Sequence, residues 1–161
     1  PVGIEHNIVG KLLLKVLDTY VQIKDIGFVG YEKMLIVLSR NDYEPDVCFW
    51  KTPKSSTFTP GQTQFPAPDF IAEVLSPGTE KTDRTIKKDD YEAHGVGEYW
   101  IIDPAAQIVE QYLLSRGRYE LRVRADSGIL KSREIRGFTV PLLALFDEEE
   151  NLATLRKILS A

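Results

Sequence analysis

The chain has 161 residues, a hydrophobic fraction of 43%, a charged fraction of 27% and a net charge of −4. A chain of this length can bury a substantial core, so it does not depend on disulfides or structural metals to fold. No apolar run approaches the roughly 20 residues that cross a bilayer, and an acidic protein does not hold nucleic acid by bulk electrostatics. We expect one soluble domain over residues 1–161.

Cys48 is the only cysteine, and it lies in an apolar segment between Val47 and Phe49. It cannot form an internal disulfide, and free cysteine is among the residues that are most often buried. The first residues also lack the pattern of a secretory signal. We therefore expect a small buried side chain and a cytoplasmic, reducing compartment.

Apolar patterns predict the first elements of the chain. Residues 4–21 carry apolar side chains at the spacing of one helix face, which are Ile8, Leu12, Leu13, Val16, Leu17 and Tyr20. Met34–Leu38 is an apolar run of strand length, which predicts a strand buried on both faces. A second strand is predicted over Pro45–Trp50.

Residues 52–68 are rich in Pro, Ser, Thr and Gly, which predicts a long loop between two strands. Because binding and catalytic residues often lie on loops, this segment is a candidate substrate-facing element. The strand that follows it includes Asp69 to Glu73 and is ended by Ser76–Gly78.

The second half of the chain alternates predicted helices and strands. A polar helix begins at Thr82 or Asp83, runs to about His94 and stops at Gly95. The later elements are strands over Tyr99–Asp103, Ile108–Leu114 and Tyr119–Val123 and short helical pieces over Leu142–Phe146 and Leu152–Leu159. This order of elements predicts an α/β sheet domain.

Carboxylates on an apolar strand are the strongest chemical signal in the sequence. Asp69, Ile71 and Glu73 point to one face of their strand, so two of the three residues on that face are acidic. A buried carboxylate without a partner is costly, and such acids usually hold a metal or a proton. Glu73, between Ala72 and Val74, is therefore interpreted as a functional residue.

Asp46 supplies a second acid from a different strand. If the two strands are neighbours, Asp46 and Glu73 provide two oxygen ligands for a hard cation such as Mg²⁺ or Mn²⁺. A turn acid after Pro45 is an equally good interpretation of Asp46. Asp69 lies about 13 Å from Glu73 at the rise of a strand, so it is interpreted as a strand-start or supporting acid.

Lys87 lies on the polar helix at helical spacing from Asp83 and Tyr91. Beside a metal site, its amino group would orient or deprotonate a water molecule and offset charge on a phosphate. An exposed surface lysine is the alternative interpretation. Together, Asp46, Glu73 and Lys87 predict metal-dependent hydrolysis of a phosphodiester bond.

Other polar residues carry weaker signals. His6 and His94 are too far apart in the sequence for a recognisable metal motif. Arg118, Arg122 and Arg124 share one face of a predicted strand, which indicates either a solvated sheet edge or a track for phosphates.

Four motifs, in this order, resemble the Uma-two family of candidate endonucleases. They are Pro45-Asp46-Val47, Pro68-Asp69-Phe-Ile-Ala-Glu73-Val-Leu-Ser-Pro77, Asp83-Arg84 with Lys87 and Tyr91, and Gly95-Val-Gly-Glu-Tyr-Trp-Ile-Ile-Asp-Pro104. That family resembles a branch of the PD-(D/E)XK restriction-endonuclease superfamily. The resemblance implies a restriction-endonuclease-like mixed sheet flanked by helices and Mg²⁺-dependent cleavage of nucleic acid. It also implies that the nucleic acid is DNA and that the protein is a homodimer.

The resemblance also assigns roles to individual residues. Asp46 and Glu73 would be the catalytic, metal-binding acids, and Glu5 would be the supporting acid of the first helix. The superfamily carries a lysine two residues after the second acid, where this chain has Leu75. Lys87 would be its displaced substitute, with Asp69 and Tyr91 as further supporting residues.

Two hypotheses of function follow from the sequence. The first is a Mg²⁺-dependent endonuclease, and the second is a nuclease-fold binding or assembly module with weak or no catalysis. The first is the leading hypothesis and is motivated by Asp46, Glu73 and Lys87. The second is motivated by the acidic charge and by the missing lysine on the strand of Glu73. Family members usually carry a short strand pair before the first helix, so the domain of residues 1–161 is expected to lack that pair.

Overall fold

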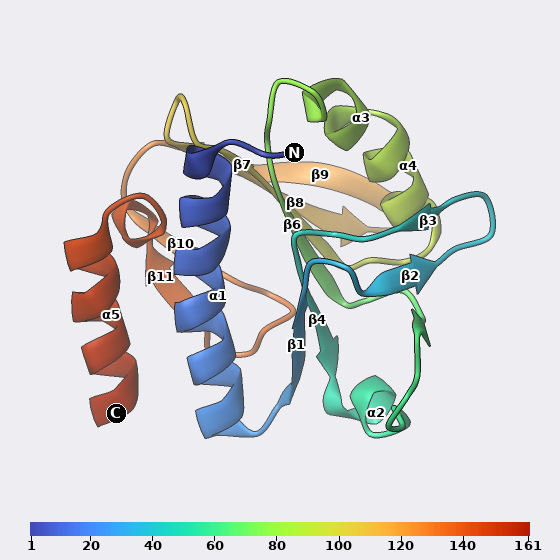
Figure 1. Ribbon diagram of the computed structural model, residues 1–161, viewed down its shortest axis with the longest axis horizontal. Helices are drawn as coiled ribbons and strands as arrows, with labels where there is room; N and C mark the ends of the chain where they lie inside the picture. The colour runs from blue at the N-terminus through green and yellow to red at the C-terminus, as the bar shows by residue number, and fades with distance from the viewer.

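A mixed six-stranded sheet forms the centre of the structure, a computed structural model that describes residues 1–161 (Figure 1). From edge to edge its strands are β1 (Gly27–Tyr31), β4 (Val47–Lys51), β6 (Phe70–Val74), β7 (Glu98–Asp103), β8 (Ile108–Ser115) and β9 (Arg118–Ala125). Neighbouring strands are antiparallel, except that β6 and β7 are parallel. Helices on both faces of this sheet confirm the predicted α/β fold.

The remaining elements surround this sheet. The helices are α1 (Ile4–Lys24), α2 (Thr52–Ser55), α3 (Glu80–Arg84), α4 (Ile86–Ala93), the 3₁₀ helix η1 (Leu142–Leu145) and α5 (Glu148–Ser160). Two small sheets are formed by β3 (Asp42–Tyr43), β2 (Leu35–Val37) and β5 (Gln64–Phe65), and by β10 (Ile129–Lys131) and β11 (Thr139–Pro141). None of the helices combines the length and the apolar character that a bilayer crossing requires.

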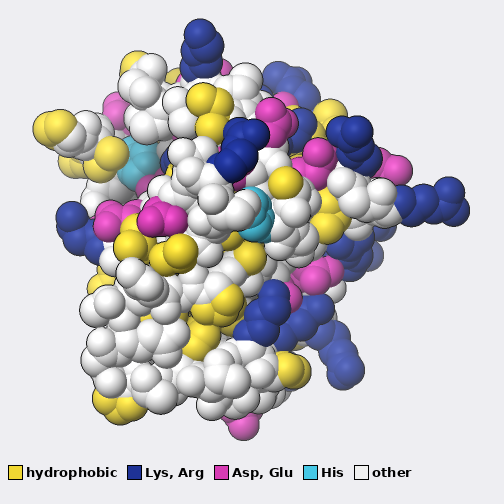
Figure 2. Space-filling view, turned by 90° about the vertical axis from the view of Figure 1, so that its right-hand side faces the viewer, with side chains coloured by type: hydrophobic (Ala, Val, Ile, Leu, Met, Phe, Trp, Pro, Cys, Tyr) yellow, Lys and Arg dark blue, Asp and Glu magenta, His cyan; other side chains and the backbone are white.

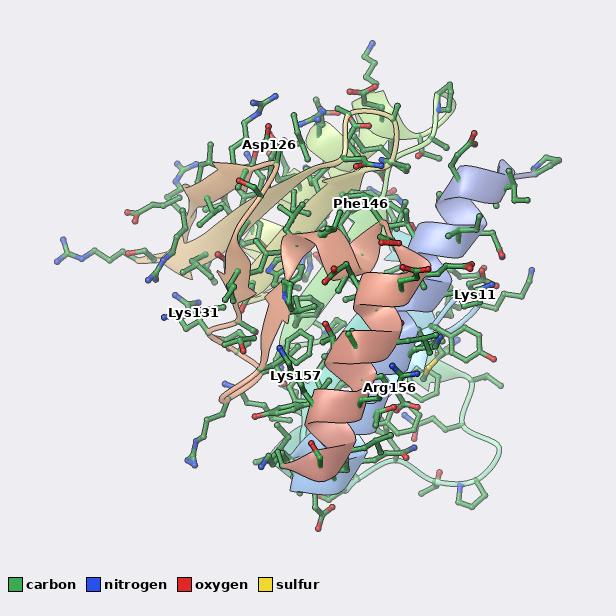
Figure 3. All side chains as sticks on the ribbon, turned by 90° about the vertical axis from the view of Figure 1, so that its left-hand side faces the viewer. Lys11, Asp126, Lys131, Phe146, Arg156 and Lys157 are labelled. Carbon is green, nitrogen blue, oxygen red and sulfur yellow. The ribbon has the colours of Figure 1, made fainter.

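Helices α1 and α5 cover one face of the sheet. The predicted apolar stripe of α1 is buried and packs against Phe70, Ala72 and Val74 of β6. Helix α5 lies alongside α1 (Figure 3). The buried Asn151 side chain of α5 donates a hydrogen bond to the carbonyl of Leu12 at 2.9 Å, which joins the two helices. The helix predicted over residues 4–21 is therefore confirmed and extends to Lys24.

The other face of the sheet is covered by α3, α4 and the small sheet of β2, β3 and β5. Its core includes Ile71 of β6, which belongs to the same apolar cluster as Trp50, Tyr91 and Tyr99. Along β6, Phe70, Ala72 and Val74 thus face α1 and Ile71 faces the opposite core. The alternation predicted for this strand is confirmed.

The predicted polar helix is broken into two helices. Helix α3 ends at Arg84 and α4 begins at Ile86, with Thr85 between them in a non-helical conformation (φ −123°, ψ −87°). The hydroxyl of Tyr99 donates a hydrogen bond to the carbonyl of Asp83 at 2.8 Å. In a continuous helix this carbonyl would accept from the amide four residues later, so the tyrosine replaces a helical hydrogen bond.

The expectation for Met34–Leu38 was wrong in one respect. Strand β2 lies in the small three-stranded sheet, where it contributes the buried Ile36, but Val37 is 40% exposed. This small sheet packs against the core with one face only. The strand is therefore buried on one side, although its sequence is apolar throughout.

The predicted long connection over residues 52–68 is present and contains the short elements α2 and β5. This segment joins the end of β4 to the start of β6, and because these strands are antiparallel, it lies at the end of the sheet away from Asp46 and Glu73. Helix α2 marks that end in Figure 1. Phe58 and Phe65 pack around the Trp50 ring, with centroid distances of 5.2 and 5.7 Å. The segment completes the core and does not face the acids.

Candidate active site

Asp46 and Glu73 are brought together by the pairing of β4 with β6. Val47 lies opposite Ala72 in this ladder, so the residue before Val47 and the residue after Ala72 are cross-strand neighbours. Asp46 Oδ2 accepts a hydrogen bond from the Val74 amide at 2.8 Å, and the Asp46 amide donates to Glu73 Oε2 at 3.4 Å. The two acids therefore share one end of the strand pair.

Helices α3 and α4 place three further side chains at Glu73. Lys87 Nζ lies 3.3 Å from Glu73 Oε1, and the Tyr91 hydroxyl donates to the same oxygen at 2.8 Å. Lys87 Nζ also lies 2.9 Å from Oδ1 of Asp83 on α3. The structure thus brings Lys87 and Tyr91 to Glu73, and it adds Asp83, which was not among the predicted site residues.

Glu73 is held in an environment that disfavours its charge. Its exposed fraction is only 2%, and burial raises the pKa of this carboxyl to about 8. The Lys87 charge and the Tyr91 hydrogen bond lower this pKa, whereas the neighbouring charges of Asp46 and Asp83 raise it. Without a further cation, the Glu73 carboxyl is therefore protonated more readily than an ordinary glutamate.

Lys87 is held as a cation. Burial lowers its pKa, but the carboxylates of Glu73 and Asp83 raise it, and the net shift is upward. A lysine with a raised pKa keeps its proton at neutral pH. Its ammonium group therefore suits stabilisation of negative charge on a phosphate better than removal of a proton from water.

His6 is the side chain of α1 that reaches the acids, and it was not among the predicted site residues. Its Nε2 atom lies 3.2 Å from Asp46 Oδ2. The sequence did contain a signal, because His6 precedes Val9 and Leu13 at helical spacing and so belongs to the buried stripe of α1. The side chain of Glu5, the predicted supporting acid, is exposed and contacts neither Asp46 nor Glu73.

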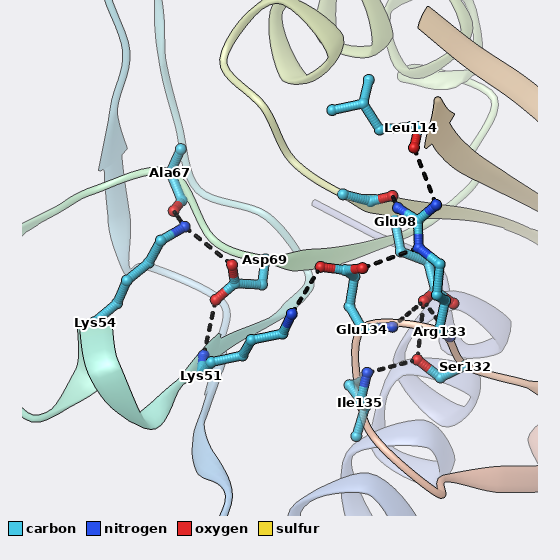
Figure 4. Close-up of polar contacts among 11 residues, drawn as sticks. Lys51, Lys54, Ala67, Asp69, Glu98, Leu114, Ser132, Arg133, Glu134 and Ile135 are labelled. Atoms are coloured by element: carbon cyan, nitrogen blue, oxygen red, sulfur yellow. Dashed lines mark hydrogen bonds and ion pairs between the residues drawn. The ribbon is translucent and has the colours of Figure 1, made fainter. Parts of the chain in front are cut away.

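Asp69 lies at the other end of β6 and belongs to a different polar network (Figure 4). Its carboxylate accepts a hydrogen bond from the Lys51 amide at 2.8 Å and pairs with Lys54 Nζ at 3.0 Å. Lys51 Nζ continues the network to Glu134 at 3.1 Å. Asp69 is therefore a strand-start acid that ties α2 to the sheet.

Asp46 and Glu73 are the neighbouring carboxylates that could hold a metal ion. Glu73 and Asp83 both pair with Lys87, and the buried Asp83 Oδ1 accepts no hydrogen bond beyond this ion pair. An oxygen donor set of this kind suits Mg²⁺ or Mn²⁺ rather than a soft metal. No three His, Cys, Asp or Glu side chains converge as a complete metal-ligand cluster. The protein would thus supply few ligands and leave positions for water and phosphate.

The surface over α3 and α4 is mixed in charge. Figure 2 shows this side of the molecule, where lysine and arginine side chains lie among acidic ones rather than forming one broad basic surface. Arg84, for example, pairs with Glu110 and with Glu80, and Arg124 lies 4.0 Å from Glu110. Arg124 of β9 thus belongs to an ion-pair network at the sheet edge.

Comparisons with known proteins identify the family. Residues 1–144 match the family model Uma2, described as "Putative restriction endonuclease". The fold is similar to that in a crystal structure of "a putative nuclease belonging to DUF820" from Anabaena variabilis ATCC 29413. The TM-score is 0.76 at 20% sequence identity, over 96% of this chain and 83% of that chain. No curated protein was matched. Because the family model spans most of the sequence, including Asp46, Glu73 and Lys87, the chain belongs to the Uma2 family of restriction-endonuclease-like proteins.

Proposed function

We propose that this protein is an endonuclease that hydrolyses phosphodiester bonds of nucleic acid, with Mg²⁺ or Mn²⁺ as its cofactor. The observation that carries the proposal is the buried Glu73 carboxylate, which lies beside Asp46 and contacts Lys87. Burial disfavours the charged form of this carboxylate, and a bound cation would stabilise that form. Membership of the Uma2 family supports the same reaction class.

Asp46 and Glu73 would hold the metal ion. When bound, a divalent ion lowers the pKa of a water molecule and offsets charge on the phosphate. The Val74 amide and His6 orient Asp46, and Tyr91 orients Glu73, so both carboxylates are fixed before substrate binds. The Lys87 ammonium group would face the negative charge that develops on the phosphate as water attacks phosphorus and the leaving oxygen departs.

Three finer features are part of the proposal. DNA as the substrate follows from the description of the family, and the homodimer follows from the resemblance of the sequence. A cytoplasmic location is supported by Cys48, which is buried and free. Light scattering on the purified chain tests the dimer, because a monomer and a dimer differ twofold in mass.

The test is metal binding followed by cleavage. We expect calorimetry to detect Mn²⁺ binding to the wild type, and Asp46→Ala and Glu73→Ala to lose it while remaining folded. Asp89→Ala is the matched control, because Asp89 is an exposed acid on α4 outside the site. Cleavage of labelled DNA should require Mn²⁺ or Mg²⁺ and should fail in the same two variants.

Either of two results would contradict the proposal. Cleavage that survives Glu73→Ala would place the catalytic centre elsewhere. A folded wild type that neither binds Mn²⁺ nor cleaves nucleic acid would leave the binding or assembly module as the better hypothesis.

A further inference from the structure

A narrow groove leads from Asp46 along α1, and we propose that it binds a single strand of nucleic acid. This α1 groove has a volume of about 220 Å³, and its walls include Asn7, Gly10 and Lys11 of α1, Tyr31 and Glu32 at the end of β1, and Asp46. His6, which contacts Asp46, also lines it. The inference rests on the proposed function, since it names the form of nucleic acid that the Asp46 site receives.

Tyr31 gives the groove a surface on which a base can stack. Its side chain is 57% exposed, which is unusual for a large aromatic residue on a sheet. Tyr31 lies opposite Val47 in the β1–β4 ladder, and the adjacent Glu32 amide donates to the Asp46 carbonyl at 3.0 Å. The position of the ring is therefore tied to Asp46 through the backbone.

Gly10 keeps the groove open. A glycine inside a helix is less favourable than alanine, so it usually has a packing reason. At Gly10 a Cβ atom would meet no heavy atom within 4 Å, which excludes packing against the protein as that reason. The open space on this side of α1 is the groove itself, and a side chain at position 10 would occupy it.

Lys11 supplies positive charge beside this space. It is exposed, and Figure 3 shows it on the side of α1 away from β10 and β11. Because Lys11 lines the same groove as Asp46, it can contact a phosphate next to the one that is cleaved.

The occupant is a single strand rather than a duplex for two reasons. Stacking on Tyr31 needs a base with a free face, and bases inside a duplex have none. In addition, a net charge of −4 does not favour the broad basic surface that duplex binding normally uses.

The experiment measures binding without cleavage. Fluorescence anisotropy, recorded in Ca²⁺, measures the binding of three labelled ligands: a single-stranded DNA oligonucleotide, its RNA equivalent and the DNA duplex. The proteins are the wild type and the variants Tyr31→Ala, Tyr31→Phe, Gly10→Leu, Lys11→Ala and Lys15→Ala. We expect Tyr31→Ala to raise the Kd for the single strands at least about fivefold. Tyr31→Phe keeps the ring and should bind as the wild type does.

The other variants distinguish binding in the groove from nonspecific effects of a substitution on folding or charge. Gly10→Leu should block the groove while melting at the wild-type temperature or above, because leucine favours the helix more than glycine does. Lys11→Ala should reduce the slope of log K against log salt by about 0.7. Lys15, one turn further along α1, does not line the groove, so Lys15→Ala should leave the Kd unchanged.

Two results would overturn the inference. One is a wild type that binds the duplex at least as tightly as the single strands, and the other is unchanged single-strand affinity in both Tyr31→Ala and Gly10→Leu. These outcomes are separate from failure of the proposed function. Single-strand binding that depends on Tyr31, without cleavage or Mn²⁺ binding, would support the groove and contradict the nuclease function. Cleavage that the groove variants leave unchanged would support the nuclease function and contradict the groove.

Discussion

Glu73 shows at the residue scale how one position serves binding at the expense of stability. Its carboxyl is buried beside two other acids, and the one lysine nearby does not offset this environment. Buried acids of this kind are retained where a ligand uses them. The same feature makes the stability of the metal-free protein depend on pH.

We expect Glu73→Gln to stabilise the metal-free protein at high pH. The pKa of Glu73 is about 8 in the folded protein against an ordinary value of 4.5, so between these pH values the unfolded chain binds fewer protons than the folded protein. Stability from this group is therefore lost as pH rises from 4.5 to 8. In EDTA, urea unfolding should show the variant gaining more than about 2 kcal/mol over the wild type between pH 5 and pH 9.

The comparison has an internal control. At pH 5 both side chains are neutral, so the difference in the free energy of unfolding should be small. A difference that is constant from pH 5 to pH 9 would show that Glu73 does not titrate in this range.

Lys87 should matter for the rate rather than for substrate binding alone. Removing a positive group aimed at the transition state typically lowers kcat by about 100-fold or more. We expect this loss in Lys87→Ala, with partial activity in Lys87→Arg, because arginine keeps the charge. Lys88→Ala is the control, since Lys88 lies over the Tyr112 ring, 4.2 Å from its centroid. A normal kcat in Lys87→Ala would contradict the role assigned to Lys87.

At the scale of elements, the β2–β3 hairpin is fastened to α4. The buried Asp90 accepts hydrogen bonds from Asn41 Nδ2 at 2.8 Å and from the Tyr43 hydroxyl at 2.5 Å, and pairs with Arg40. His94 Nε2 accepts a hydrogen bond from the Ser39 amide at 3.0 Å. Asp46 follows this hairpin directly, and α4 carries Lys87, so these contacts set the position of one site residue relative to the other.

Tyr43→Phe should therefore weaken metal binding from a distance. Losing the hydroxyl leaves Asp90 with one hydrogen bond fewer, which should lower the free energy of unfolding by about 1 kcal/mol. We also expect a weaker Mn²⁺ affinity by calorimetry, because Asp46 lies three residues after Tyr43. Asp90→Asn should have a larger effect, and Asp89→Asn, on the exposed side of α4, should have none. Unchanged Mn²⁺ affinity in a destabilised Tyr43→Phe would show that the hairpin serves stability only.

At the scale of the whole molecule, Glu98 joins the sheet to the C-terminal segment. Its side chain is fully buried and accepts hydrogen bonds from Trp100 and Gln111 within the sheet and from Ser132, Arg133 and Glu134 outside it. Figure 4 shows part of this network. Every partner is a donor, so a carboxylate satisfies all of them.

Glu98→Gln should consequently be costly although the shape is kept. The amide nitrogen of glutamine would face hydrogen-bond donors where a carboxylate oxygen accepted from them, and each such loss costs about 1–3 kcal/mol. We expect urea unfolding to show a loss of more than about 2 kcal/mol at pH 7. Glu120→Gln, on the exposed edge strand β9, is the control and should change little. Equal stability of the two variants would contradict the role assigned to Glu98.

Local patterns predicted a large part of the fold and of the candidate site. The stripe of α1, the alternation along β6 and the Gly95 stop of α4 are properties of short segments, and the structure confirms each of them. Glu73 was recognised because an acid between apolar strand residues is anomalous in the sequence itself. The placement of Asp46 beside it was a conditional prediction, since it required that β4 and β6 be neighbours.

The sequence by itself determined the α/β class, the family motifs and the identity of the acids, because these depend on residue type and on spacing within one element. Only the tertiary structure decided that His6 rather than Glu5 reaches Asp46, and that Asp83 joins Lys87 at Glu73. It also decided that residues 52–68 lie at the far end of the sheet. These outcomes depend on strand direction and on contacts between segments that are distant in the sequence, and no local period encodes them.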